Sequence, residues 1–164
     1  MAQNSHLIQR KNWFENHPQY LAIQAHGYDK DNPFTSRSAM LVYLELCESK
    51  HWFGVEIHFS DKLKRVYLSG KPRKKAEKEI IVPLSVNTSL TVEEIQNIVT
   101  EIQQCLRDTP EYSSRNLGVT LGICDSDSSI VYYKVYNGLM EPGPPNADDY
   151  DQDKDIFEVV TEKK

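Results

Sequence analysis

The sequence predicts an α+β fold, or an α/β fold with a small mixed β-sheet, in which helices flank the strands. Helical patterns come first, strand patterns follow, and a further helix and a final pair of strands complete the order. Two patterns are especially clear: the alternating apolar residues of segment 52–59, and a long helical stripe after Thr91. With 164 residues, the chain is long enough for one domain with a real core and two tails.

The first two predicted elements are helices. Proline is favoured in the first turn of a helix and glycine often ends one, so we expect a short helix from Pro18 to His26, stopped by Gly27. Residues 36–50 are expected to form a second helix that is mostly buried. Its apolar side chains are Ala39, Met40, Val42, Tyr43, Leu44, Leu46 and Cys47.

Three strands are predicted next, at residues 52–59, 65–70 and 79–84. Alternation in the first strand puts four apolar side chains on one face: Phe53, Val55, Ile57 and Phe59. The opposite face then carries Trp52, Gly54, Glu56 and His58. Pro83 lacks a backbone N–H, so it marks either the end of the third strand or an edge position.

The third helix follows a capping box formed by Thr91 and Glu94. Apolar residues recur after it at helical spacing, and we interpret them as one stripe that faces the core. The stripe consists of Val92, Ile95, Ile98, Val99, Ile102 and Leu106.

The last predicted element is a β-hairpin over residues 117–137. Its first strand has large apolar side chains on one face and small residues on the other, which leaves room for a helix to pack closely. Its second strand, 129–136, carries apolar or aromatic side chains on both faces. A strand with one face in water should alternate apolar and polar residues, so this one is either a central strand or is completed by a partner chain.

Composition divides the chain into three parts. Residues 1–12 are polar and expected to be flexible, residues 13–140 are expected to form the domain, and the Pro-rich, acidic residues 141–164 are expected to be disordered. The net charge of −5 argues against attraction of nucleic acid by the whole surface. Basic residues nevertheless gather at 62–78 and acidic residues at 148–158, so two local fields of opposite sign exist.

Cysteine usage and hydropathy suggest an intracellular protein. Cys47, Cys105 and Cys124 are odd in number, widely spaced and set in apolar patterns, which favours buried, reduced thiols over disulfides. The N-terminal residues lack the apolar core of a signal peptide, and no segment is long and apolar enough to span a membrane. We expect no membrane association, no bound metal and no cofactor.

Two groups of side chains are candidates for chemistry. Glu56 and His58 share a strand face, where they form a candidate acid/base pair or half of a metal site; an ordinary polar strand face is the alternative. The second group lies in the last strand: Tyr132, Tyr133, Lys134 and Tyr136. Because adjacent strand residues point to opposite faces, Tyr133 and Lys134 do not converge, and we favour a packing role for this group.

Two loops carry charge that suits binding. The basic loop 71–78 is a candidate for electrostatic, sequence-independent contact with RNA. The residues concerned are Lys71, Arg73, Lys74 and Lys75. Asp125 and Asp127 lie in the loop of the last hairpin, where they suit a tight turn or docking into a basic pocket of another protein. This loop lacks the further oxygen ligands that calcium needs.

Three segments carry a resemblance to a known family: HPQYLAIQAHG, AMLVYLELCESKHW and CDSDSSIVYYKVYNGLMEPGPPN. Together they resemble the small non-catalytic subunit of eukaryotic tRNA-splicing endonucleases, the Sen-fifteen family, over residues 12–146. The resemblance implies a fold similar to the C-terminal, nuclease-like domain of tRNA-intron endonucleases. It also implies a nuclear location and a place in a heterotetramer that removes introns from pre-tRNA.

The resemblance also implies that catalysis has been lost. In that family a tyrosine, a histidine and a lysine converge on the scissile phosphate. The segments where the histidine and the lysine belong read IIVPLSVNTSL and RNLGVTLGIC here, and neither contains a histidine or a lysine. No histidine follows His58. The resemblance therefore predicts a structural subunit without a catalytic triad.

The family assembles through its last hairpin, which maps onto two groups of residues here. Paired subunits align their last strands, and the corresponding residues are Ile130, Val131, Tyr133 and Val135. Pairs then dock when an acidic loop enters a basic groove of a catalytic neighbour, which implicates Asp125 and Asp127. The partners expected are the catalytic and structural subunits of the endonuclease, with pre-tRNA as the substrate of the assembly.

Two alternatives remain open on the sequence alone. One is an independent RNA-binding module, or a homodimer formed when the second strand of the hairpin pairs with its own copy in the absence of a partner. The other is an active ribonuclease that uses His58 or a tyrosine and lysine pair.

Overall fold

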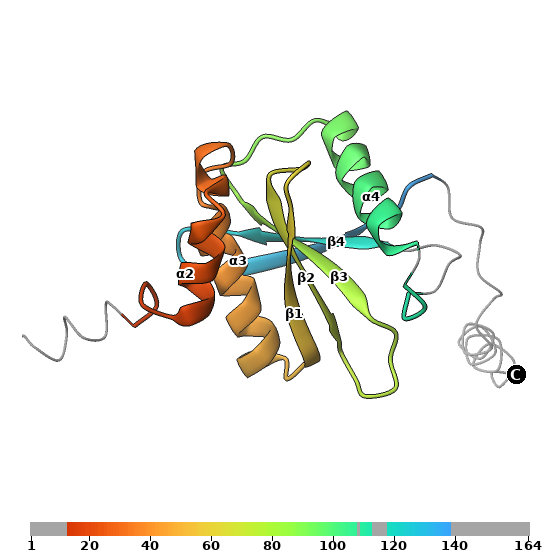
Figure 1. The fold of residues 1–164 in the computed structure, drawn as a ribbon, viewed down its shortest axis with the longest axis horizontal. Coiled ribbons are helices and arrows are strands. Elements are labelled where there is room, and N and C mark those ends of the chain that lie inside the picture. Colours follow the sequence, from red (N-terminus) through yellow and green to blue (C-terminus); the bar gives the residue numbers. More distant parts are fainter. Residues whose placement is uncertain (1–12, 108, 113–117, 139–164) are drawn as a thin grey trace, which may run out of the picture.

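The computed structural model describes residues 13–107, 109–112 and 118–138 (Figure 1). Along the chain these residues form α2 (Pro18–Ala25), the 3₁₀-helix η1 (Tyr28–Lys30), α3 (Thr35–Leu44), the π-helix η2 (Glu45–Ser49), β1 (Phe53–Ser60), β2 (Arg65–Lys71), β3 (Glu79–Ser85), α4 (Val92–Leu106), β4 (Val119–Cys124) and β5 (Ile130–Val135). The predictions made for segments 1–12 and 141–164 lie outside the described residues.

The five strands form one mixed sheet in the order β1-β2-β3-β4-β5. Neighbours are antiparallel except β3 and β4, which are parallel. A parallel pair needs a crossover connection, and α4 supplies it. Figure 1 shows α2 and α3 on one side of the sheet and α4 on the other. The predicted α+β fold with a small mixed sheet flanked by helices is confirmed.

One core lies between α4 and the sheet. It is lined by Tyr67, Ile80, Val82, Leu84, Ile98, Val99, Ile102, Tyr112, Val119 and Leu121. The predicted capping box is present, because Thr91 Oγ1 accepts from the Glu94 amide and Glu94 accepts from the Thr91 amide. The stripe is confirmed for Ile98, Val99 and Ile102. It is wrong for Val92, which is 73% exposed because the first turn of α4 lies beyond the core.

A second core lies under α3. It contains Val42, Leu46, Leu68, Ile81 and Cys124, with Ile130 and Tyr132 of β5 packed against it. The face of β4 that was predicted to carry small residues lies against α3. A Cβ added to Gly122 would stand 3.2 Å from a methyl group of Val42 on α3 and 3.2 Å from one of Ile81. The sheet and α3 can approach this closely because Gly122 has no side chain.

The second predicted helix is regular over only part of its length. It begins as expected near residue 36, but after Leu44 it widens into the π-helix η2, in which the Lys50 amide donates to the Glu45 carbonyl at 2.9 Å. A π-turn adds one residue to the turn and so shifts the side chains that follow it. Leu46 stays buried, while Tyr43, Leu44 and Cys47 are only partly buried.

A β-bulge interrupts the first strand. The register between β1 and β2 shifts between Phe53 and Glu56, and Gly54 adopts a left-handed φ of 58°. Phe53 pairs with Lys71 and Glu56 pairs with Ser69, so Phe53 and Glu56 share a face. The prediction that Phe53 lies on the buried face with Val55 and Ile57 is therefore wrong, because strict alternation does not hold across a bulge.

Pro83 lies inside the central strand β3, opposite Gly122 of β4. Pairing of β2 with β3 ends at Ile81, so at Pro83 the strand has a paired neighbour on one side only. The prediction of a strand end or an edge position is therefore wrong, because β3 continues to Ser85 in the middle of the sheet; the missing N–H is tolerated where β2 no longer pairs with β3.

The three cysteines are free thiols in different environments: Cys124 is buried, Cys47 is partly buried and Cys105 is exposed on α4. The expectation of burial is wrong for Cys105, which lies in the last turn of α4 and is exposed there. Within the described ranges, no helix is long and apolar enough to cross a membrane.

Two valines of α4 provide a matched test of this fold. Val99 is fully buried in the core beneath α4 and Val92 is exposed. We expect Val99→Ala to lower the free energy of unfolding by about 2 kcal/mol, because the buried methyl groups are removed and a cavity remains. Val92→Ala is expected to change it by less than about 0.5 kcal/mol. Urea denaturation of both variants checks this, and equal decreases would contradict the placement of α4.

Candidate functional site

The last hairpin ends in a strand with an open side. β4 and β5 pair without a register shift from Val119 opposite Val135 to Cys124 opposite Ile130. β5 is the last strand in the sheet order, so among the described residues nothing pairs with its outer side. Within the described part of the chain, β5 is therefore an edge strand and not a central one.

The two faces of β5 differ in what covers them. Ile130 packs against the core beneath α3, and Val135 packs against the core beneath α4. Val131 and Tyr133 lie on the same face as Val135 but remain 52% and 59% exposed. Of the four predicted partner-binding residues, Val131 and Tyr133 are therefore accessible, and Ile130 and Val135 are partly used by the protein's own core.

The other edge strand, β1, is less suited to accept a further strand. Its bulge at Gly54 interrupts the regular ladder, and its middle carries Glu56 and His58. Bulges and charged side chains are the usual means by which proteins block unwanted pairing at an edge. β5 has no bulge and no proline, and Lys134 is its only charged residue. Among the described strands, the sheet thus has a bulged, charged edge at β1 and a regular, unpaired edge at β5.

The acidic loop between β4 and β5 is a tight turn. The Asp125 amide donates to the Ser129 carbonyl at 2.9 Å, and Asp127 Oδ1 accepts from the Ser129 amide at 2.8 Å. Hydrogen bonds from Ser129 to its carboxylate lower the pKa of Asp127. Both aspartates are exposed, and neither forms an ion pair with another described residue. The turn therefore presents two carboxylates to solvent.

A cavity of about 190 Å³ lies between this loop and the start of α3. Its lining consists of Phe34, Arg37, Ser38, Leu41, Ser85, Asn87, Cys124, Asp125 and Ser126. Arg37 Nη2 also donates to the Ser126 carbonyl across it at 3.5 Å. The cavity is smaller than typical ligand pockets, and its lining contains no histidine or lysine. It offers no evident site for catalysis.

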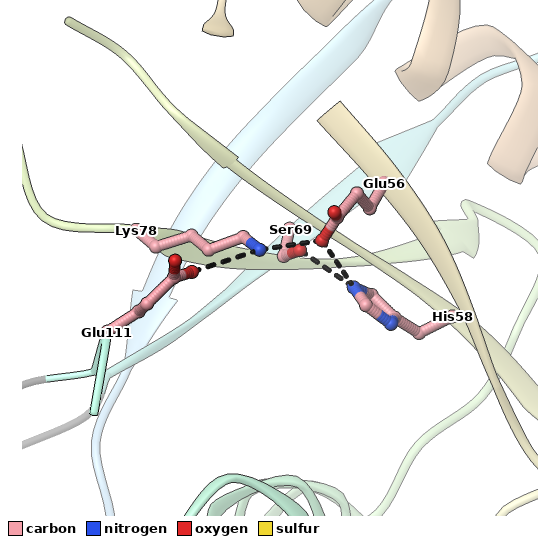
Figure 2. Close-up of polar contacts among 5 residues, drawn as sticks. All are labelled: Glu56, His58, Ser69, Lys78 and Glu111. Carbon is pink, nitrogen blue, oxygen red and sulfur yellow. Dashed lines mark hydrogen bonds and ion pairs between the residues drawn. The ribbon is translucent and has the colours of Figure 1, made fainter. Parts of the chain in front are cut away.

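A polar network centred on Lys78 lies at the other end of the sheet (Figure 2). Lys78 Nζ contacts Glu56 Oε2 at 2.6 Å and Glu111 Oε2 at 3.4 Å, and the Lys78 side chain is only 11% exposed. Burial acts to lower the pKa of Lys78, but the hydrogen bond and charge of Glu56 outweigh it and raise the pKa. The same hydrogen bond and the charge of Lys78 lower the pKa of Glu56. Lys78 thereby ties β3 to β1 and to segment 109–112.

His58 joins this network through its Nε2 atom. That nitrogen lies 2.7 Å from Ser69 Oγ and 3.8 Å from Glu56 Oε2 (Figure 2). The imidazole stacks on Tyr67 with ring centroids 4.9 Å apart. Burial lowers the pKa of His58; the charge of Glu56 opposes this shift, and that of Lys78 adds to it. The predicted pair is thus close in space, but both members have partners within the fold.

Side chains of both predicted chemical groups have partners within the fold. Within the part of the chain that the structure describes, no three histidine, cysteine or acidic residues lie close enough to hold a metal ion. In β5, burial raises the pKa of Tyr132, whose ring lies under Lys50. Tyr133 and Lys134 point to opposite faces of the strand, and Lys134 lies over the Tyr136 ring. These contacts support packing rather than acid–base chemistry.

The four predicted RNA-contacting residues lie at the end of β2 and in the loop after it. Lys71 is partly buried, while Arg73, Lys74 and Lys75 are exposed. Lys74 Nζ lies over the Phe53 ring, 5.8 Å from its centroid. Phe53 is 44% exposed and belongs to this surface, a role that sequence reasoning missed. The signal was Gly54, since a glycine inside a strand often marks a bulge.

The fold and the hairpin together define a small α+β protein with one open sheet edge and an acidic loop beside it. Comparison with known proteins adds the family. Residues 41–146 match the family described as Sen15 protein. The chain is 34% identical over 134 residues to the tRNA-splicing endonuclease subunit Sen15 of Mus musculus, covering 82% of this chain and 76% of the mouse protein.

Two further relatives agree. The tRNA-splicing endonuclease subunit Sen15 of Homo sapiens is 33% identical over 134 residues, which cover 82% of this chain and 75% of the human protein. The probable tRNA-splicing endonuclease subunit sen15 of Schizosaccharomyces pombe is 28% identical over 136 residues, with 77% and 94% covered. The chain belongs to the Sen15 family, and the resemblance stated from the sequence is confirmed.

The network around His58 predicts a pH-dependent stability. An unfolded histidine has a pKa of about 6.5, and the pKa of folded His58 is lower. Between the two values the unfolded chain binds more protons, so the free energy of unfolding falls as the pH drops below about 6.5 and levels off below the folded pKa. We expect His58→Gln to lose less stability than wild type between about pH 7.5 and about pH 5.5 in urea denaturation.

The exposed His51 provides the control for this measurement. His51→Gln should retain the pH dependence of the wild-type protein, because His51 lies outside the network. An identical pH dependence in wild type and His58→Gln would show that His58 does not cause it.

Proposed function

We propose that this chain is the Sen15 subunit of a nuclear, heterotetrameric tRNA-splicing endonuclease, in which it has a structural and not a catalytic role. Its family membership and the names of its mouse, human and fission yeast relatives support this proposal. It pairs with a catalytic subunit, and the assembly acts on pre-tRNA.

The observation that carries the proposal is the open edge of β5. An added strand would satisfy the outward backbone groups of β5 through hydrogen bonds, and the side chains beside it would supply apolar burial. Val131 and Tyr133 are exposed at this edge and would be buried by such a strand. The partner's own last strand is the occupant, so the two sheets become continuous across the interface. In isolation, the same edge lets two copies of this chain pair as a homodimer.

The acidic loop serves a second contact. Asp125 and Asp127 stand at the tip of the hairpin, at the end of the strand that pairs, and both are exposed. They dock into a basic groove of a catalytic neighbour in the other pair of subunits. Charge complementarity of this kind guides association and fixes the register of two surfaces.

The environment of His58 supports a non-catalytic role. A ribonuclease needs a general acid and a cation that is available to phosphate. Burial holds His58 toward its neutral form by lowering its pKa, and two carboxylates already neutralise Lys78. The purified chain should therefore leave an intron-containing pre-tRNA uncut. Specific cleavage that disappears in His58→Ala would favour the ribonuclease alternative.

A charge at the β5 edge tests the pairing. We expect Tyr133→Asp, and equally Val131→Asp, to reduce co-purification of the catalytic subunit at least about tenfold, because pairing would bury an unpaired carboxylate. Both side chains are exposed in the isolated chain, so its circular dichroism should not change. Val135→Asp is unsuitable, because Val135 packs against the core beneath α4 and the variant should unfold.

The matched control is Val92→Asp, a charge placed at an exposed valine on α4. This variant should retain the partner. Full co-purification of the catalytic subunit with folded Tyr133→Asp would contradict pairing through β5.

The charge of the acidic loop can be removed without breaking its turn. In the double variant Asp125→Asn with Asp127→Asn, each amide oxygen can still accept the hydrogen bonds that hold the turn. We expect the tetramer to dissociate into pairs more readily, with a smaller salt dependence than wild type, in sedimentation velocity at low and high salt. Glu48→Gln with Glu93→Gln removes two exposed charges elsewhere and should not have this effect. Equal behaviour of the two double variants would exclude docking by the loop.

A further inference from the structure

The sheet carries an aromatic and basic surface at the edge opposite β5. It consists of Phe53, Lys71, Arg73, Lys74 and Lys75, and is called here the Phe53 surface. Phe53 begins the edge strand β1, and the four cations lie at the end of β2 and in the loop after it. The surface therefore lies at the far end of the sheet from the edge proposed to pair with a catalytic subunit.

The bulge at Gly54 gives Phe53 its position. Phe53 pairs with Lys71, so both side chains leave the same face of the sheet. The ring belongs to none of the described apolar clusters and is 44% exposed. Lys74 Nζ lies 5.8 Å from its centroid. A ring that is partly in water, with one cation over it and others in the adjoining loop, is the arrangement on which nucleic acid bases stack.

The charges of the Phe53 surface are not neutralised within the fold. Lys50, Lys62 and Lys78 each form an ion pair with a glutamate. Among the described residues, the four cations of the Phe53 surface form none. Segment 71–77 contains these four cations and a single carboxylate, that of Glu77. The surface is thus locally positive on a chain whose net charge is −5.

We propose that the Phe53 surface binds a single-stranded segment of RNA, with a base stacked on the Phe53 ring and the adjoining phosphates held by Lys71, Arg73 and Lys74. This inference rests on the proposed function and deepens it, because it names an unpaired region of pre-tRNA as the element that this subunit contacts. In a duplex the base faces are covered by their neighbours, so a stacking ring selects unpaired nucleotides. An acidic protein segment would use the cations but would not need the ring.

Fluorescence anisotropy with the full-length chain tests the proposal. The probe is a fluorescein-labelled single-stranded RNA of about 12 nucleotides and mixed sequence, compared with the same sequence as a duplex. We expect tighter binding of the single strand, and we expect Phe53→Ala to weaken it at least about fivefold. Phe53→Trp should restore binding. The pair Arg73→Ala with Lys74→Ala should weaken binding and reduce the slope of log affinity against log salt by about 0.7 for each phosphate that the variant no longer neutralises.

Matched controls are available on the same chain. Phe34→Ala removes an exposed aromatic ring from the turn before α3, 55% exposed against 44% for Phe53, and should leave RNA binding unchanged. Lys30→Ala with Lys62→Ala removes two exposed cations elsewhere. RNA binding by this variant should remain as sensitive to loss of the Phe53 ring as binding by wild type. Equal RNA affinity of Phe53→Ala and wild type would overturn the proposal, as would a preference for the duplex. Full displacement of the RNA by polyglutamate, together with no effect of Phe53→Ala, would identify an acidic protein segment as the partner instead.

Failure of this inference can be told from failure of the proposed function. Phe53→Ala should still co-purify with the catalytic subunit, because Phe53 and β5 lie at opposite edges of the sheet. Normal assembly with unaltered RNA binding in Phe53→Ala would reject the Phe53 surface alone. Unchanged assembly in Tyr133→Asp would reject the pairing mode, whatever the RNA measurement gives.

Discussion

The parallel pairing of β3 with β4 is the constraint on which the rest of the structure depends. Two parallel neighbours need a crossover, so α4 must lie across one face of the sheet, and only the other face is left for α3. Gly122, in the middle of this pair, lets α3 approach the strands closely. The antiparallel hairpin β4–β5 then continues the sheet outward, so β5 becomes an edge by topology and not by a local property of its sequence.

This topology separates the functions proposed for the chain. The β5 edge is regular and carries exposed apolar side chains, which suits strand addition. The β1 edge is bulged and polar in its middle, and the same bulge exposes Phe53 beside cations that form no ion pair with a described residue. Subunit pairing and RNA contact are thus assigned to opposite ends of one sheet. The network of Lys78, Glu56 and His58 stabilises the fold by joining β1, β3 and segment 109–112.

Sequence reasoning succeeded where periodicity alone decides the outcome. The capping box at Thr91, the stripe of α4, the small face of β4 and the apolar side chains on both faces of β5 all follow from local pattern. It failed where the pairing register, or contacts between residues far apart in the sequence, determine whether a side chain is buried. Alternation placed Phe53 in the core because a bulge is not visible as a change in hydropathy, and Val92 fits the stripe but lies past the end of the core. The burial of Lys78 depends on Glu56 and Glu111, which are far from each other in the sequence.

Hydrogen exchange of the β5 backbone tests the central claim most directly, because strand addition must protect amides that are open in the free chain. The β5 amides that point away from β4 should exchange rapidly in the isolated subunit at low concentration, where no homodimer forms. In the complex with a catalytic subunit they should become strongly protected, while the amides of β1 change little. Unchanged exchange in β5 on formation of the complex, with new protection elsewhere on the chain, would contradict assembly through this edge.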